Sequence, residues 1–372
     1  MDDQLLLAVE SSCDESAVAL VRGGGEVLVE RVASQTALHA RFGGVIPEAA
    51  AREHHAWVPR LLEEVLREAE RSGIAREIAG VAVTTGPGLV GSLLVGAGVA
   101  SGWAWARGLP IVPVNHLEGH LRAAWLRDAP DAPIPRLPAI GLVVSGGHTL
   151  LVRIAADGSI ERLGGTIDDA AGEAFDKIAR LLGLPYPGGA ALSALAATLP
   201  RGSVVAPLPI ANVDSPYDFS FSGVKTAAIR RALAASGLSD RSPGRAATLT
   251  RLFAEHPLPE GAAAAIGAAT EQAIVGALRA AVERALRAHP DCSLIIGGGV
   301  AANAPLRAAM AEVAAAERRA VVVPPLKWCT DNAAMIGAAG WWLLRDHRGA
   351  FQDPSRGLEV HAQWPIGSPV PA

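Results

Sequence analysis

Residues 111–120 read Ile-Val-Pro-Val-Asn-His-Leu-Glu-Gly-His, so an apolar, strand-like run leads directly into two histidines. His116 and His120 are four positions apart, and on a helix both imidazoles project from one face, where they can bind one metal ion. A helix that begins at the end of a strand is also where α/β proteins place their ligands. The stretch therefore predicts half of a metal site in an α/β fold.

The best candidate for a third ligand is Asp331, which follows the apolar residues 321–323 and two prolines much as His116 follows residues 111–114. The alternative is that the two histidines only cap or pack a helix. Gly119 weighs against this alternative, because a glycine inside a helical turn costs about 1 kcal/mol relative to alanine. We therefore expect the two strand ends to bring the three side chains together.

The same order of expected elements occurs twice along the chain. The expected strands are 5–9, 17–21, 27–32, 78–85 and 111–114 in the first half, and 140–144, 150–154, 160–163, 294–296 and 320–323 in the second. This repeat predicts two homologous α/β lobes that face each other across a cleft where both ligand motifs meet. The expected division is an N-terminal lobe at 1–135, a C-terminal lobe at 136–340 with an insertion at about 234–264, and a C-terminal helix and tail at 341–372 that packs back on the first lobe.

Several stretches carry more specific expectations. Pro59 should kink or divide the helix expected at 46–70. Residues 86–106 are uncharged and long enough to span a bilayer, but their glycines and the flanking strands favour a buried helix in a βαβ unit. The Pro- and Gly-rich residues beyond Arg356 are expected to lie at the surface.

Composition describes a globular protein with a sizeable core, since half of the 372 residues are hydrophobic. A net charge of −4 gives no overall basic signal, so nucleic acid would need a local patch or other subunits. The three cysteines, Cys13, Cys292 and Cys329, form no Cys-x-x-Cys pair and are expected to be free thiols in a reducing compartment. With no signal-peptide pattern at the N-terminus, the sequence predicts a cytoplasmic protein.

The turn after the first strand, residues 10–16, is unusually rich in carboxylates and hydroxyls. Asp14 and Glu15 are candidate catalytic residues on a loop that faces a phosphate or metal site, the alternative being a merely solvated turn. Glycines at 146, 147, 298 and 299 remove side chains so that backbone N–H groups can approach a nucleotide. A single Gly-Gly pair would indicate no more than a turn.

Eight motifs occur in one order along the chain. They are Glu-Ser-Ser-Cys-Asp-Glu-Ser at 10–16, Gly-Pro-Gly-Leu at 86–89, His-Leu-Glu-Gly-His at 116–120, Ser-Gly-Gly-His-Thr at 145–149, Gly-Glu-Ala-Phe-Asp-Lys at 172–177, Asp-Phe-Ser-Phe-Ser-Gly at 218–223, Gly-Gly-Val-Ala-Ala-Asn at 298–303 and Cys-Thr-Asp-Asn at 329–332. In these motifs the chain resembles the bacterial TsaD (Gcp-like) tRNA N6-adenosine threonylcarbamoyltransferases. The resemblance implies the duplicated actin, sugar kinase and Hsp70-like (ASKHA) fold, an α/β fold of two lobes with a cleft between them.

The resemblance also implies an activity, partners and residue roles. The threonylcarbamoyl group would pass from threonylcarbamoyl-AMP to the N6 amine of the adenosine 3′ of the anticodon, in tRNAs that read codons starting with A, with release of AMP. The implied partners are tRNA, a TsaB-like paralogue on the N-terminal lobe and a TsaE-like ATPase, without a membrane. The implied metal ligands are His116, His120 and Asp331. The implied substrate-binding residues are Val143, Val144, Ser145, Gly146, Gly147, Asp176, Gly189 and Asn303.

Two imidazoles and one carboxylate suit either Fe²⁺ or Zn²⁺, and the resemblance favours Fe²⁺. A zinc metallopeptidase is one alternative, because His-x-Glu-Gly-His resembles His-Glu-x-x-His. Glu118, however, lies about 160° around the helix from His120 and should point away from the metal. An ATPase or kinase of the ASKHA class is the other alternative, although histidine ligands are foreign to its Mg²⁺ chemistry.

Overall fold

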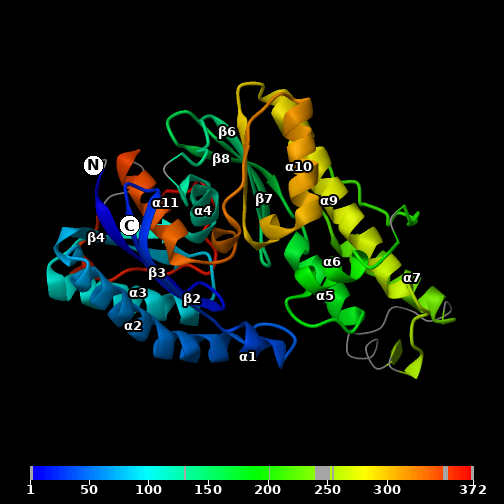
Figure 1. Cartoon of the computed structure of the whole chain (residues 1–372), viewed down its shortest axis with the longest axis horizontal. Coiled ribbons are helices and arrows are strands. Elements are labelled where there is room, and N and C mark those ends of the chain that lie inside the picture. Colours follow the sequence, from blue (N-terminus) through cyan, green and yellow to red (C-terminus); the bar gives the residue numbers. More distant parts are fainter. Residues whose placement is uncertain are drawn as a thin grey trace.

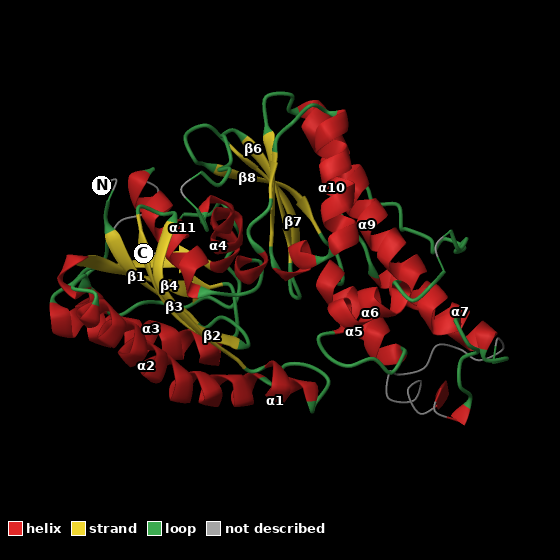
Figure 2. Cartoon of the chain, in the orientation of Figure 1, coloured by secondary structure: helices red, strands yellow, loops and turns green. Residues whose placement is uncertain are grey.

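The computed structural model describes residues 3–129, 131–200, 202–238, 252–253, 255–346 and 351–369. Each lobe is built on a five-stranded mixed sheet, with strand orders β3-β2-β1-β4-β5 and β10-β9-β6-β7-β8 (Figures 1 and 2). The strands are β1 Leu5–Glu10, β2 Glu15–Arg22, β3 Glu26–Ser34, β4 Ile78–Gly86 and β5 Ile111–Asn115 in the first sheet, and β6 Ala139–Val144, β7 Thr149–Ile154, β8 Ile160–Gly165, β9 Ser293–Gly297 and β10 Val321–Val322 in the second.

The two sheets repeat one topology. β1 runs antiparallel to β2 and parallel to β4, which is parallel to β5. In the second sheet, β6 runs antiparallel to β7 and parallel to β9, which is parallel to β10. The predicted duplication is therefore confirmed strand by strand, and the chain has the expected α/β architecture of two lobes.

Helices cover both sheets. They are α1 Thr36–Ala40, α2 Pro47–Arg71, α3 Val90–Arg107, α4 His116–Arg122, α5 Ala171–Leu181, α6 Gly188–Ala196, α7 Ser222–Ala235, α9 Ala262–Ala288, α10 Ala304–Ala316 and α11 Ala333–Arg345. The short 3-10 helices are η1 Ala75–Glu77, η2 Ala123–Trp125, η3 Gly299–Ala302, η4 Leu326–Trp328 and η5 Pro354–Arg356.

The alternation of side chains along each strand divides the core into layers. On β1, Leu5 and Leu7 pack with α2 and α3, whereas Leu6 and Ala8 face α11. On β6, Leu142 packs with α5, α9 and α10, whereas Val143 belongs to the cluster that contains α4 and α11. Helices α4 and α11 therefore lie in an apolar layer between the two sheets, as Figure 2 shows.

The C-terminal residues return to the first sheet. Gln352 forms a bridge with Ile111, and the His361 N–H donates to the carbonyl oxygen of Thr85 at 2.8 Å. Trp364 and Ile366 are buried, with 5% and 6% of their surface exposed. The expectation that residues beyond Arg356 lie at the surface therefore holds for most of this segment and fails for these two apolar side chains, which gain free energy by burial whatever the Pro and Gly content around them.

Two other expectations need correction. α2 is one continuous helix, so Pro59, at an exposed position, does not divide it. α3 is not buried on all sides, because Val90, Leu94 and Trp105 are 45%, 55% and 67% exposed. Within the described residues, no helix has both the length and the apolar character needed to cross a bilayer.

Two of the expected divisions of the chain stay predictions. Of the insertion expected at 234–264, residues 239–251 and 254 lie outside the described residues. α11, which begins at Ala333, packs on the first sheet. The proposed division of the chain at residue 340 would therefore cut through this helix.

Candidate metal centre

Both histidines belong to α4, the short helix that begins directly after β5. Asn115, the last residue of β5, caps this helix, because its Oδ1 accepts a hydrogen bond from the N–H of Leu117 at 2.9 Å. The two imidazole rings lie edge to face, with centroids 4.7 Å apart. A Cβ added at Gly119 would lie 2.8 Å from the Ile336 side chain, so the glycine lets α4 pack closely on α11.

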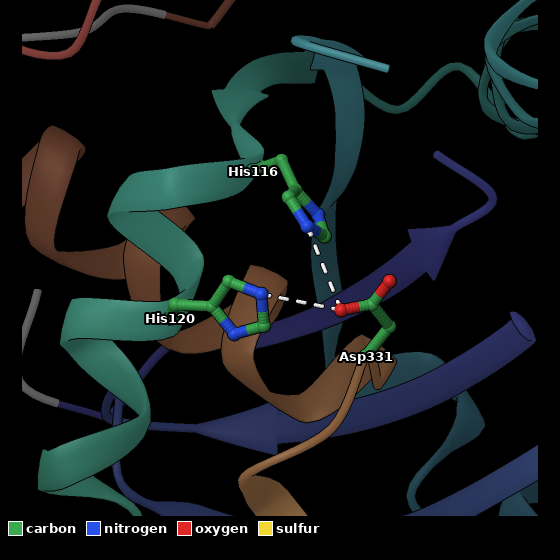
Figure 3. Close-up of side chains that lie close together, drawn as sticks. All are labelled: His116, His120 and Asp331. Carbon is green, nitrogen blue, oxygen red and sulfur yellow. Dashed lines mark ion pairs between the residues drawn. The ribbon is translucent and has the colours of Figure 1, made fainter. Parts of the chain in front are cut away.

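Asp331 reaches the same point from the other strand end. It precedes α11, which is capped by Asn332 through a 2.8 Å hydrogen bond from the N–H of Met335. The Asp331 Oδ1 atom lies 3.5 Å from Nε2 of His116 and 3.2 Å from Nε2 of His120, as Figure 3 shows. The predicted convergence of the three side chains is therefore present in the structure.

The donor set fits a divalent metal ion. His120 is fully buried, and neither of its ring nitrogens has a hydrogen-bond partner of good geometry among the described residues. A buried imidazole without such a partner is costly unless something else satisfies it. Two imidazole nitrogens and one carboxylate oxygen within reach of a single point form a group that can hold one ion.

Glu10 is a site residue that sequence reasoning missed. It ends β1, is fully buried, and its Oε2 lies 3.2 Å from Nδ1 of His116 and accepts a 2.5 Å hydrogen bond from Thr84. A carboxylate on the far nitrogen fixes the orientation and tautomer of a metal-binding histidine. The available signal was its position, a single acidic residue at the end of an otherwise apolar strand.

The charged groups of this buried cluster shift one another's pKa values. Burial opposes protonation of His116, but Asp331 and Glu10 outweigh it and raise the pKa of the imidazole to about 9. Burial also opposes ionisation of Asp331, yet the neighbouring histidines hold the pKa of that carboxyl well below its usual range. Without an ion, a proton on His116 therefore balances the carboxylates.

Asp14 and Glu15 lie beside the metal ligands. Their carboxylate oxygens and that of Asp331 are all within 4.8 Å of one another. Burial, with the charges of Asp14 and Asp331, raises the pKa of Glu15 to about 9. The acidic turn therefore faces the predicted metal site, and the alternative of a merely solvated turn is wrong.

The strand end of β6 brings five of the predicted substrate-binding residues to one turn, Val143, Val144, Ser145, Gly146 and Gly147. The valines are fully buried, whereas the two glycines are exposed. Gly172, at the start of α5, packs so closely on this turn that an added Cβ would lie 2.5 Å from the carbonyl oxygen of Ser145. The N-terminus of α5 and the glycine turn therefore form one surface.

His148, in the same turn, is a second residue that sequence reasoning did not assign. Burial, together with the charges of His116 and His120, lowers its pKa to about 4, so its imidazole is neutral at pH 7. Its presence in the Ser-Gly-Gly-His-Thr motif was the available signal.

Asp176, Gly189 and Asn303 lie elsewhere in the second lobe. Asp176 accepts a 2.7 Å hydrogen bond from the N–H of Gly188, which joins α5 to α6. Asn303 caps α10, and its amide donates to Glu271 at 2.8 Å and to Ser193 at 2.9 Å. The contacts of Asn303 thus hold helices together, and a role in substrate binding stays a prediction.

Comparison with known proteins identifies the family of the chain. Residues 26–338 match the family described as TsaD: tRNA N6-adenosine threonylcarbamoyltransferase. A protein of that name from Enterococcus faecalis (strain ATCC 700802 / V583) is 45% identical over 341 residues, which cover 91% of this chain and 90% of the relative. The chain belongs to the TsaD family. Another TsaD relative, from Geobacter sp. (strain M21), is 43% identical over 362 residues that cover 97% of this chain and 96% of its own.

Solved structures agree with the fold of this TsaD chain. The crystal structure of T. kodakarensis HypF superposes with a TM-score of 0.56 at 13% sequence identity, over 92% of this chain and 48% of HypF. At so low an identity the likeness supports the fold alone. Together with the duplicated sheets it assigns the TsaD chain to the ASKHA class.

The peptidase alternative fails on geometry as well as on family membership. Glu118 is buried on α4, with Oε1 3.7 Å from the guanidinium of Arg122. It lines a cavity of about 180 Å³ with Asn115, Leu343 and Trp364, none of which is a metal ligand. Glu118 is therefore not placed to activate a metal-bound water in this TsaD chain.

Proposed function

We propose that this chain transfers the L-threonylcarbamoyl group from threonylcarbamoyl-AMP to the N6 amine of the adenosine 3′ of the anticodon, in tRNAs that read codons starting with A, and that AMP leaves. Family membership makes the chain a tRNA-modifying transferase of the acyltransferase type. The observation that carries the finer proposal is the meeting of His116, His120 and Asp331 between two lobes, one of which presents a glycine turn suited to a nucleotide.

The metal ligands in this proposal are His116, His120 and Asp331, with Fe²⁺ favoured over Zn²⁺. A bound divalent ion supplies a Lewis acid for a phosphate or carbonyl oxygen of the donor. Glu10 has a separate task, because its hydrogen bond with Nδ1 of His116 directs the Nε2 lone pair toward the ion. The burial of Glu10 and His120 also excludes water from this side of the site.

The second lobe binds the donor in this proposal. The exposed backbone of Gly146 and Gly147, next to the N-terminus of α5, suits the phosphate of an adenylate. Asp176 and Gly189 are proposed to contact the ribose or the threonyl part, and Asn303 to hold the start of α10 against it. Val143 and Val144, at the end of β6, are proposed to support this donor-binding site.

Asp14 and Glu15 are proposed to assist the transfer of the proton that the attacking amine loses. When the adenosine amine attacks the carbamoyl carbon, it must lose a proton, and a carboxylate at Asp14 is close enough to the ligand Asp331 to accept it. Glu15 stays protonated at neutral pH in the free protein, since its pKa is about 9, and can donate a hydrogen bond. No side-chain nucleophile is needed, because the tRNA amine is itself the nucleophile.

Protein partners complete the proposal. We propose that a TsaB-like paralogue binds the N-terminal lobe, where α3 exposes Val90, Leu94 and Trp105, and that a TsaE-like ATPase supports turnover. With a net charge of −4, the isolated chain has no overall positive charge that would attract the phosphates of tRNA. We therefore propose that the single chain binds tRNA weakly. We also propose that the protein acts in the cytoplasm without a membrane.

The test is a reconstitution with threonylcarbamoyl-AMP, tRNA and both partners, in which AMP and threonylcarbamoyladenosine are quantified together with bound iron and zinc. One AMP should be released for each modified adenosine, and one metal ion should be bound per chain. Electrophoretic titration of tRNA should show weak binding to the single chain and tighter binding to the complex. Release of AMP without modification of tRNA, or full activity after removal of the metal, would contradict the proposal.

A further inference from the structure

One hydrogen bond connects the acidic turn of the first lobe to the second lobe. The hydroxyl of Tyr186, in the turn between α5 and α6, donates to Oδ2 of Asp14 at 3.4 Å. These residues are 172 positions apart in the chain. Tyr186 is half-buried, so its ring is partly packed while its hydroxyl reaches the other lobe.

The turn that carries Tyr186 leads directly to Gly189, which is proposed, with Asp176, to contact the ribose or the threonyl part of the donor. The N–H of Gly188 donates to the Asp176 carboxylate at 2.7 Å, and the N–H of Gly189 contacts the same group. A movement of this turn would therefore move Tyr186 as well. The Tyr186 phenol thus joins the acidic turn to the turn that leads to Gly189.

A second contact supports the same approach of the two lobes. Arg180, near the end of α5, lies against the loop between α1 and α2, where a Cβ added at Gly43 or Gly44 would be 3.3 Å from its guanidinium. Gly43 has a φ of +67°, which favours glycine. Residues at the end of α5 and just after it therefore contact two separate loops of the first lobe.

The phenol is suited to act as a donor. Burial raises the pKa of the Tyr186 hydroxyl, and the carboxylates of Asp14 and Asp176 raise it further, so the proton stays on the oxygen. A neutral donor on one carboxylate oxygen restricts the rotation of that carboxylate.

We propose that Tyr186 is a positioning residue for the transfer, because it orients the Asp14 carboxylate when the α5–α6 turn is seated on the donor. The proposal rests on the proposed function, in which Asp14 accepts the proton of the attacking amine. Tyr186 itself does not contact the reacting atoms. Because Tyr186 belongs to the second lobe, it orients Asp14 only when the two lobes are together. Proton transfer is thereby linked to occupation of the donor-binding site.

The first test is Tyr186→Phe in the reconstituted complex, since this change removes the hydroxyl and keeps the ring. The expected result is a kcat about tenfold lower, the loss typical of one hydrogen bond to a charged group, with KM for threonylcarbamoyl-AMP within about twofold. The matched control is Tyr217→Phe, the only other tyrosine of the chain, which should leave both values unchanged. An unchanged kcat for Tyr186→Phe would overturn the proposal.

The second test asks whether Tyr186 acts through Asp14. In single-turnover reactions, Asp14→Asn should slow transfer by about a hundredfold or more, as loss of a proton acceptor does. Adding Tyr186→Phe to Asp14→Asn should slow it no further, because the carboxylate to be oriented is gone. Independent losses that multiply in the double variant would show that Tyr186 acts by another route.

The third test does not depend on activity. Amide hydrogen exchange of the substrate-free protein should increase at residues 10–16 and 182–188 in Tyr186→Phe but not in Tyr217→Phe. If the unaltered complex fails to modify tRNA while the exchange increases, the inter-lobe contact stands and the proposed function falls. If the complex modifies tRNA but Tyr186→Phe changes neither rate nor exchange, the inference about Tyr186 alone is wrong.

Discussion

The two lobes share one strand topology but differ in what stands at equivalent strand ends. β1 ends at the buried carboxylate of Glu10, whereas β6 ends at Val144. The turn after β1 then presents Asp14, while the turn after β6 presents the bare backbone of Gly146 and Gly147. In a duplicated scaffold, the first lobe has thus specialised in charged side chains and the second in backbone donors.

The ends of the last strands, β5 and β10, do not follow this difference between the lobes. β5 leads into α4 with His116 and His120, and β10 leads through η4 to Asp331. Each lobe therefore contributes to one ligand group, which is complete only when the lobes are packed together. Changes at either strand end test whether the two lobes are equally necessary.

The largest effect is expected from removing the ligand that the second lobe contributes. Asp331→Ala should lower transfer by about a thousandfold, because several kcal/mol of transition-state stabilisation by the ion are lost. Bound metal, measured by elemental analysis, should fall in parallel, while the circular dichroism spectrum stays the same. Asp291→Ala, an exposed aspartate before β9 in the same lobe, is the control. Metal retained by an inactive Asp331→Ala would contradict the ligand assignment.

A smaller effect is expected at the strand end that distinguishes the lobes. Glu10→Gln keeps the size of the side chain but weakens its hold on His116, so metal affinity should fall by about 10- to 100-fold, as for other partners of metal-binding histidines. Competition with a chelator measures this affinity. Glu15→Gln, in the same turn but without a hydrogen bond to His116 among the described contacts, should affect metal affinity much less. Equal losses in both variants would contradict the role given to the hydrogen bond between Glu10 and His116.

The third prediction concerns the pH dependence of stability without metal. The pKa of His116 rises from 6.5 to about 9 on folding, so its stabilisation is complete below pH 6.5 and is lost as the pH rises through 9. Glu15 acts in the same direction, because its carboxyl stays protonated to about 9 when folded but ionises near 4.5 when unfolded. The Tm of the metal-free protein should therefore fall by several degrees between pH 6.5 and 9.

Differential scanning calorimetry of the metal-free protein provides the measurement. His116→Gln should reduce the slope over this pH interval, since one of the two groups is then absent. A Tm that rises between pH 6.5 and 9 would show that the buried cluster is not protonated as the pKa of His116 implies.

The smallest effect is expected on the far side of α4. Glu118→Gln should leave metal content unchanged and transfer within about twofold, because the side chain lies beside Arg122 rather than the ligands. A polypeptide substrate incubated with the unaltered protein should stay intact. Cleavage that stops in Glu118→Gln would instead revive the peptidase alternative.

Much of this protein could be predicted where the evidence is local in sequence. The spacing of His116 and His120 places both rings on one helix face whatever surrounds it. The repeated order of apolar runs and glycine turns predicted two equivalent sheets, and the equivalence of their last strands pointed to Asp331. Failures arose where a local rule was overruled, as at Pro59, which an exposed position of a long, well-packed helix accommodates.

The tertiary structure alone decided which distant residues meet. Glu10 touches His116 because β4 lies between β1 and β5 and all three run parallel, which brings their carboxyl ends to one edge. Tyr186 reaches Asp14, and Trp364 becomes buried, only through the packing of separate segments. The periodicity and spacing of side chains follow from backbone geometry, so they can be recognised from residues that are close in the sequence. Strand order and lobe packing depend instead on the free energy of the whole fold, so the contacts that complete the site appear only in three dimensions.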